Sequence, residues 1–189
     1  MSTPGRIRVI GGSLRNSRIE VPDLPGLRPT TDRVRETLFN WLQPVVDGAR
    51  CLDLYAGTGA LGLEALSRGA AAVTFVEREP RLAAALKANL ARLKVEGEVI
   101  ADDAARWLQG RARPFDLVFL DPPFALDAWA TTAHALEAGG WLASRAWIYV
   151  ESPRSASLAL PDSWLPHRQG HAGEVAYALY RRTPADPLS

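Results

Sequence analysis

Residues 53–62 read DLYAGTGALG, and Gly57, Gly59 and Gly62 within them have the spacing G-x-G-x-x-G. The preceding segment RCLDLY (50–55) is short and apolar, which is typical of a buried strand, whereas the following ALGLEALSRG is typical of a helix. Glycines at such a turn let the backbone approach a ligand, and the N-terminus of the helix carries partial positive charge. The stretch therefore predicts an α/β unit with a ligand beside the turn.

The same alternation continues along the chain. Short apolar segments lie at 72–77, 98–101, 115–121 and 146–151, with helical patterns between them. Strict alternation predicts parallel strands with helices on both faces, and ligand sites beyond the carboxyl ends of the strands. The segments SWLPHRQG and EVAYALYRR predict an antiparallel hairpin at one edge. We expect a Rossmann-like sheet of seven mostly parallel strands.

The N-terminal part predicts a small extension. RIRVIGG and SRIEVP are separated by SLRN, which indicates a β-hairpin, and a turn-rich segment leads to the helix TDRVRETLFNWL, capped by Thr31 or Asp32. A later helix, in DAWATTAHALEAGG, has Asp127 as its expected N-cap. We therefore divide the chain into a basic arm (residues 1–30), a main domain (31–183) and a frayed tail (184–189).

Length and composition exclude several classes of protein. A chain of 189 residues with 47% hydrophobic residues suits one domain with a buried core, and we expect a monomer. It has neither a run of about 18 apolar residues nor the apolar stretch of a secretory signal, which predicts a cytoplasmic protein with no membrane partner. Cys51 is the only cysteine and is expected in the core, and the three histidines lack ligand spacing, so no metal site is predicted.

Two classes of cofactor would suit the glycine turn. In a dinucleotide site, an acid about 20 residues after the turn holds the ribose, and Glu77 fits that role. Asp53 lies four residues before Gly57, at the end of the strand. Its carboxylate would repel a pyrophosphate but would suit an ammonium group, such as that of the methionine part of S-adenosylmethionine. Asp53 therefore favours a methyl donor over a nicotinamide cofactor.

The segment LDPPF (120–124) follows the fourth strand, where the strand order should reverse. Pro122 and Pro123 lock two φ angles and remove two backbone donors, so the turn presents acceptors. We expect Asp121 and the Pro122 carbonyl to accept hydrogen bonds from an exocyclic amine and aim its lone pair at the methyl group, with Phe124 stacked on the base. Asp121 or water would take the proton. The alternative is an ordinary proline turn capped by Asp121.

LDLYAGTGALGLEAL, FVERE and FLDPPF together resemble the first, second and fourth motifs of the class I S-adenosylmethionine-dependent methyltransferases. The resemblance implies that the glycine turn packs against the cofactor, that Glu77 holds the ribose hydroxyls, and that an acid after the third strand contacts adenine. There DDAARWL offers Asp102 or Asp103, and Asp103 is equally a candidate N-cap, a role compatible with adenine contact. The predicted cofactor-binding residues are Asp53, Tyr55, Gly57, Gly59, Glu77, Asp103 and Ala104.

The N-terminal segment IRVIGGSLRNSRIEVPDLPGLRPTTDRVRETLFNWL is similar to the start of the bacterial 16S ribosomal RNA guanine-N2 methyltransferases of the RsmD type. With the later motifs, this resemblance covers roughly residues 6–182. It implies transfer to the exocyclic N2 of a guanine in 16S rRNA, presented by the small ribosomal subunit or its assembly intermediate. A D/N-P-P-aromatic tetrad marks transfer to nitrogen in the wider family. The predicted catalytic residues are Asp121, Pro122, Pro123 and Phe124.

Positive charge gathers near the N-terminus. Only two of the 22 basic residues are lysines, and residues 1–18 hold four arginines and no acid. A single exposed arginine commonly only solvates a surface, but guanidinium groups in a cluster can fork onto phosphates or stack on bases. The predicted RNA-binding residues are Arg8, Arg15, Arg18, Arg28, Arg33 and Arg35.

Three functions of different classes are compatible with these patterns. The first is methylation of guanine N2 in small-subunit rRNA. The second is an N-methyltransferase acting on DNA adenine N6 or on a protein glutamine, which would not need an arginine-bearing hairpin. The third is a non-catalytic RNA-binding module that kept the fold. Affinity for S-adenosylmethionine would distinguish the third from the first two.

Overall fold

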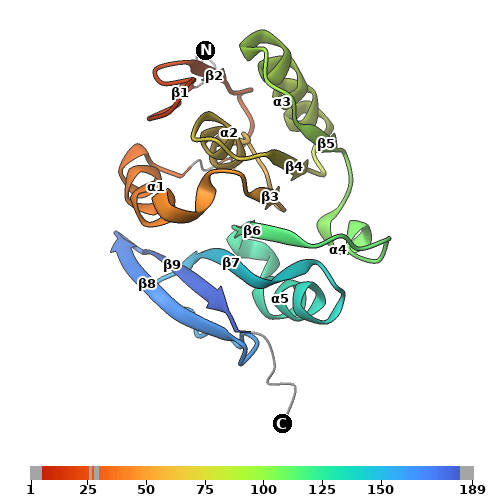
Figure 1. The fold of residues 1–189 in the computed structure, drawn as a ribbon. Coiled ribbons are helices and arrows are strands. Elements are labelled where there is room, and N and C mark those ends of the chain that lie inside the picture. The colour runs from red at the N-terminus through yellow and green to blue at the C-terminus, as the bar shows by residue number, and fades with distance from the viewer. Residues whose placement is uncertain (1–5, 26, 28–29, 184–189) are drawn as a thin grey trace.

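The structure, a computed structural model, describes residues 6–25, 27 and 30–183. Its main sheet contains β3 (Arg50–Asp53), β4 (Ala72–Val76), β5 (Glu98–Ile100), β6 (Phe115–Leu120), β7 (Leu142–Pro153), β8 (Trp164–Ala172) and β9 (Val175–Arg182). The strand order is β5-β4-β3-β6-β7-β9-β8 (Figure 1). Strands β3 to β7 pair in parallel, and β9 pairs antiparallel with β7 and β8. The predicted fold is confirmed, including a reversal of strand order between β3 and β6.

Helices cover both faces of this sheet. They are α1 (Asp32–Val46), α2 (Ala60–Ser67), α3 (Pro80–Leu93), α4 (Ala104–Trp107) and α5 (Trp129–Ala138), with a 3-10 turn, η1 (Phe124–Leu126), after β6. One buried cluster packs α1, α2 and α3 against the sheet, and a second packs α4 and α5 against the opposite face. No helix within the described residues combines the length and apolar character needed to cross a membrane.

Local sequence explains most helix boundaries, but two differ from expectation. Thr31 caps α1 as predicted, because its hydroxyl accepts from the Val34 N–H at 3.3 Å. That helix continues beyond its predicted end to Val46, whose side chain is buried. Asp127 is not the N-cap of α5: it closes η1 in a left-handed conformation with φ 46°, and Ala128 occupies the cap position. The N–H of Asp127 donates to the carbonyl of Phe124, so Asp127 belongs to this turn and does not cap α5.

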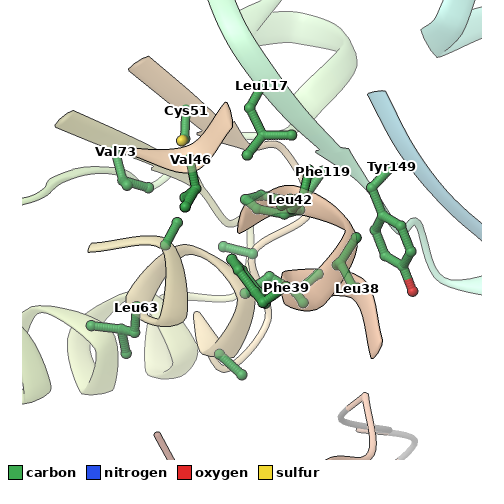
Figure 2. Close-up of a cluster of buried hydrophobic side chains, with 14 of the residues drawn as sticks. Leu38, Phe39, Leu42, Val46, Cys51, Leu63, Val73, Leu117, Phe119 and Tyr149 are labelled. Atoms are coloured by element: carbon green, nitrogen blue, oxygen red, sulfur yellow. The ribbon is translucent and has the colours of Figure 1, made fainter. Parts of the chain in front are cut away.

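The core between α1 and the sheet is closely packed. Figure 2 shows Phe39 and Leu42 of α1 lying against Phe119 of β6, with Tyr149 of β7 at the margin of the cluster. The rings of Phe39 and Phe119 lie 6.0 Å apart. Cys51 is buried in the same cluster, and burial, with smaller contributions from nearby carboxylates, raises its pKa to about 12. The thiol therefore stays protonated, in agreement with its expected place in the core.

The N-terminal hairpin pairs β1 (Arg6–Arg8) with β2 (Arg18–Glu20) antiparallel, as predicted. It docks on α2 and α3 (Figure 1). Glu64 of α2 accepts hydrogen bonds at 2.9 Å from the N–H groups of both Ile10 and Gly11. Gly12 has φ +79° and lies so close to Ser67 that a Cβ would be 2.0 Å from its carbonyl oxygen. The arm is therefore fixed to the main sheet's helices. The predicted tail at 184–189 lies outside the described residues.

Candidate active site

A cavity of about 820 Å³ opens at the carboxyl ends of the parallel strands, where the β-α alternation placed the ligand site. It is lined by predicted residues from both halves of the site: Asp53, Tyr55, Gly57, Glu77, Asp103, Ala104, Asp121, Pro122, Pro123 and Phe124. One predicted cofactor residue, Gly59, lies beside this lining and is not part of it. A Cβ at Gly59 would lie 2.4 Å from Leu86, so this glycine serves the contact between the loop and α3.

The glycine turn is held from both sides by acids. Gly57 has φ +57°, and a Cβ there would meet no protein atom within 4 Å among the described residues, so its surface faces open space. Its N–H donates to Glu77 Oε2 at 3.1 Å. The second oxygen of Glu77 accepts from the N–H of Glu79 at 3.4 Å. Burial raises the pKa of Glu77, partly offset by these two hydrogen bonds.

Asp53 lies at the end of β3 with only 2% of its surface exposed. Its Oδ2 accepts a hydrogen bond from the Gly62 N–H, in the first turn of α2, at 3.1 Å. Burial raises the pKa of Asp53 to about 7, the Gly62 bond lowers it, and the charge of Glu77 raises it further. A cation placed beside this carboxylate would favour its ionised form.

The acids after β5 and the aromatic residue of the glycine turn complete this side of the cavity. Asp103 caps α4, because its Oδ1 accepts from the Arg106 N–H at 3.1 Å, and Asp102 Oδ1 accepts from the Asp103 N–H at 2.8 Å. Both aspartates line the cavity. The Tyr55 hydroxyl lies 2.8 Å from Thr132 Oγ1 of α5, which fixes the ring at the cavity wall. The N-cap role of Asp103 is confirmed, whereas adenine contact stays a prediction.

The DPPF segment follows β6, the neighbour of β3 in the sheet, and lines the same cavity as the glycine turn. Pro122 is buried, Pro123 is exposed, and Asp121 and Phe124 are half-buried. The carbonyl of Pro123 accepts from the Leu126 N–H at 3.0 Å, so that acceptor is used by η1. The Pro122 carbonyl takes part in none of the backbone hydrogen bonds that organise the described turn. Acceptance of a hydrogen bond from a ligand by this carbonyl stays a prediction.

Sequence reasoning missed a polar network behind Asp121. The Thr30 hydroxyl lies 3.4 Å from Asp121 Oδ2 and 3.1 Å from Glu151 Oε2. Glu151, on β7, is 5% exposed and accepts a second hydrogen bond, at 2.9 Å, from the hydroxyl of Tyr149. Leu24, Pro25 and Leu27 precede Thr30 in the chain and line the cavity with it.

One sequence signal could have found Glu151. Each of the five parallel strands has an acid within two residues of its end: Asp53, Glu77, Asp102, Asp121 and Glu151. Parallel strands bring their carboxyl ends to one edge of the sheet, so acids repeated at those positions must converge. No comparable sequence pattern identifies Thr30, because its position beside Asp121 depends on how the arm packs against the main domain.

The predicted RNA-binding arginines fall into two groups. Arg8, Arg15, Arg18 and Arg33 are exposed, and Arg28 lies outside the described residues. The assignment of Arg35 is wrong, because its side chain is fully buried. Its guanidinium bonds to Asp32 at 2.5 Å and to the Arg8 carbonyl at 2.9 Å, and it lies 3.6 Å from Glu64. Arg35 therefore fastens the arm and α1 to α2.

Comparison with known proteins identifies a family that matches nearly the whole chain. The family model described as "Conserved hypothetical protein 95" matches residues 7–181. The chain is 51% identical, over 96% of its length and 92% of the relative's, to Ribosomal RNA small subunit methyltransferase D of Escherichia coli (strain K12). It is 43% identical, over 94% of both chains, to the protein of the same name from Haemophilus influenzae.

A solved structure has the same fold over nearly the whole chain. It is described as the putative methyltransferase yhhF from Escherichia coli, and it matches with a TM-score of 0.89 and 48% identity. The match covers 95% of this chain and 99% of that one. The chain therefore belongs to the Conserved hypothetical protein 95 family, the RsmD-type methyltransferases of the class I fold.

Proposed function

We propose that this protein transfers a methyl group from S-adenosylmethionine to the exocyclic N2 of a guanine in small-subunit (16S) ribosomal RNA. The observation that carries the proposal is the cavity that the glycine turn and Asp53 line together with the DPPF segment. One wall has the features of a methyl-donor site, and the other presents acceptors for an amine. The names of the relatives support ribosomal RNA as the acceptor.

The residues around the cavity fit S-adenosylmethionine. Gly57 leaves open space where a side chain would intrude, so the backbone can approach a ligand. Glu77 would hold the ribose hydroxyls, and Asp102 or Asp103 would contact the adenine. Burial raises the pKa of Asp53, and the methionine ammonium group would stabilise the ionised form of its carboxylate. The cofactor supplies a methyl group activated on a sulfonium.

The DPPF wall would orient the acceptor amine. Asp121 and the Pro122 carbonyl accept hydrogen bonds from its N–H groups, which holds the nitrogen with its lone pair directed at the methyl group. Phe124 stacks on the guanine, and its ring is itself supported by Trp129, whose centroid lies 5.7 Å away. After transfer, the proton leaves the nitrogen for Asp121 or water.

The arm would bring the RNA to this wall. Its exposed arginines, Arg8, Arg15, Arg18 and Arg33, can contact phosphates, while Leu24 and Leu27 continue the arm into the cavity lining. A guanine in a loop or bulge can enter such a pocket at a lower unstacking cost than a guanine in a duplex. This substrate places the reaction in the cytoplasm. The monomeric state stays a prediction.

The test is a comparison of acceptors. The purified protein is incubated with labelled S-adenosylmethionine and, separately, with small ribosomal subunits from cells lacking this protein, naked 16S rRNA, duplex DNA and a glutamine-bearing protein. Mass spectrometry of nucleosides should find N2-methylguanosine in the small-subunit RNA. Label in DNA adenine or in glutamine would replace this function with the second hypothesis. An absence of calorimetric binding to S-adenosylmethionine would support a non-catalytic RNA-binding module.

A further inference from the structure

We propose that Thr30 and Glu151 are positioning residues for the methyl transfer, holding the Asp121 carboxylate in the orientation that accepts the guanine amine. This inference rests on the proposed role of Asp121. Thr30 is the last residue of the arm, Glu151 lies on β7, and Asp121 directly follows β6. They meet through a single hydroxyl group, that of Thr30.

The hydroxyl of Thr30 joins two carboxylates. It lies 3.1 Å from Glu151 Oε2 and 3.4 Å from Asp121 Oδ2. A threonine hydroxyl has one proton to donate, and that proton can be shared between two acceptors in a three-centre hydrogen bond. The contact with Glu151 is the shorter of the two, and the contact with Asp121 lies near the upper limit of hydrogen-bond length. Thr30 is therefore within reach of Asp121 while being held by Glu151.

Glu151 is a fixed support for that hydroxyl. Its side chain is 5% exposed, and the hydroxyl of Tyr149 donates to the same oxygen, Oε2, at 2.9 Å. Tyr149 is fully buried, and burial, followed by the charges of Glu151 and Asp121, raises its pKa well above its ordinary value. The phenol therefore stays protonated and remains a donor. The Glu151 carbonyl also accepts from Trp129 Nε1 at 2.9 Å, which ties this end of β7 to α5.

Thr30 is held equally firmly from its own side. The next residue, Thr31, caps α1, and the carbonyl of Thr31 accepts from the Arg35 N–H at 3.0 Å. Arg35 is buried and fastened to Asp32 and Glu64, so the start of α1 is fixed relative to α2. The fixed start of α1 therefore holds the Thr30 hydroxyl in one place beside Asp121. A carboxylate that is already held in its working orientation loses less conformational entropy when the substrate binds.

The test compares two substitutions of Thr30 that differ in the hydroxyl. Thr30→Val keeps the shape and removes the donor, whereas Thr30→Ser keeps the hydroxyl. We expect Thr30→Val to lower kcat about 10-fold or more, since a hydrogen bond to a charged group is lost. The KM for small subunits and the affinity for S-adenosylhomocysteine should stay within about twofold. Thr30→Ser should recover most of the lost kcat.

Thr74→Val is the matched control. The Thr74 hydroxyl also bonds to a carboxylate, Glu98, at 3.3 Å, but it lies outside the cavity lining. Removing it should leave kcat unchanged. Glu151→Gln provides a second variant of the network, because the amide oxygen can still accept from Tyr149 while its N–H groups donate to Thr30. Its kcat should fall less than that of Glu151→Leu, with the melting temperatures of both variants measured so that a loss of folding is recognised.

Each outcome decides the inference. A Thr30→Val protein with the kcat of the wild type would overturn it, and so would equal losses in Thr30→Val and Thr30→Ser. A loss of kcat that only follows a loss of thermal stability would assign the network to folding and also overturn it. If the wild type methylates an acceptor other than guanine, the proposed function fails, and the Thr30→Val and Thr30→Ser comparison is read on that acceptor instead.

Discussion

The two halves of the cavity are built in different ways. The cofactor half takes Asp53, Gly57, Glu77 and Asp103 from consecutive β-α units, so its residues lie within about 50 positions of one another in the chain. The acceptor half joins Thr30, Asp121 and Glu151, and the hydrogen bonds of Thr30 span 91 and 121 positions. The first half depends on local turns and caps. The second depends on where the N-terminal arm docks.

This difference predicts that the two halves can be damaged independently. A change in the cofactor half should weaken binding of S-adenosylmethionine and leave the acceptor wall intact. A change in the acceptor half, or in the contacts that fix the arm, should lower the rate of transfer with little effect on cofactor affinity. The following substitutions test this separation.

The largest effect is expected from Asp121→Ala. Removing a preorganised acceptor at the reacting group should lower kcat about 1,000-fold, equivalent to about 4 kcal/mol of transition-state stabilisation. The affinity for S-adenosylmethionine, measured by calorimetry, should change less than twofold. Asp162→Ala is the control, since Asp162 is an exposed acid outside the cavity lining. An equal loss of cofactor affinity in Asp121→Ala would show that the halves are not separable.

The anchor of the arm should give the next largest effect. Arg35→Met removes a buried guanidinium and leaves its partners Asp32 and Glu64 without it, so the free energy of unfolding should fall by about 3 kcal/mol. Arg33→Met changes an exposed arginine on the same helix and should alter stability by less than about 0.5 kcal/mol. Urea unfolding measures both. Similar losses in the two variants would contradict the role given to Arg35.

The same contrast explains what the sequence could predict. The glycine turn, Asp53, Glu77 and the DPPF segment were predicted because each lies next to the strand end that positions it, and a parallel sheet brings strand ends together. The helix cap at Thr31 follows from neighbouring residues alone. These features need no knowledge of distant contacts.

Arg35 and Thr30 were beyond sequence reasoning for one physical reason. Arg35 stands among exposed arginines in a basic segment, and only the docking of the arm on α2 buries it beside Glu64. Thr30 lies in a turn-rich linker, and its partner Glu151 is 121 positions away. Asp127 failed as a helix cap for a local reason, because its N–H closes the 3-10 turn η1 by bonding to the Phe124 carbonyl. Long-range packing decided the other two.

Glu77 should affect the cofactor half alone. Glu77→Ala removes the carboxylate that accepts from the Gly57 N–H and that we expect to hold the ribose. The Kd for S-adenosylmethionine should rise about 10- to 100-fold, the usual effect of losing hydrogen bonds to a charged group. Binding of the protein to small subunits, measured by sedimentation, should be unchanged. Glu96→Ala, in the exposed loop before β5, is the matched control.

The smallest effect concerns the protonation of Asp53. Its pKa is raised to about 7, so the folded protein keeps a proton there that the unfolded chain loses near pH 4. This group therefore makes the protein less stable as pH rises from about 4 to about 7. An ammonium group beside it favours the ionised form, so binding of S-adenosylmethionine should release a proton below pH 7.

We expect the affinity for S-adenosylmethionine to fall as pH decreases from about 8 to about 6, by about 10-fold at most, because Asp53 must ionise before it can pair with the ammonium group. Calorimetry in buffers of different ionisation enthalpy would count the proton released. Asp53→Asn keeps an acceptor for the Gly62 N–H but cannot titrate, so its weaker binding should not vary over this range. An equal pH dependence in Asp53→Asn would assign the titration to Glu77, whose pKa is also raised, and would move the ammonium group from the end of β3 toward β4.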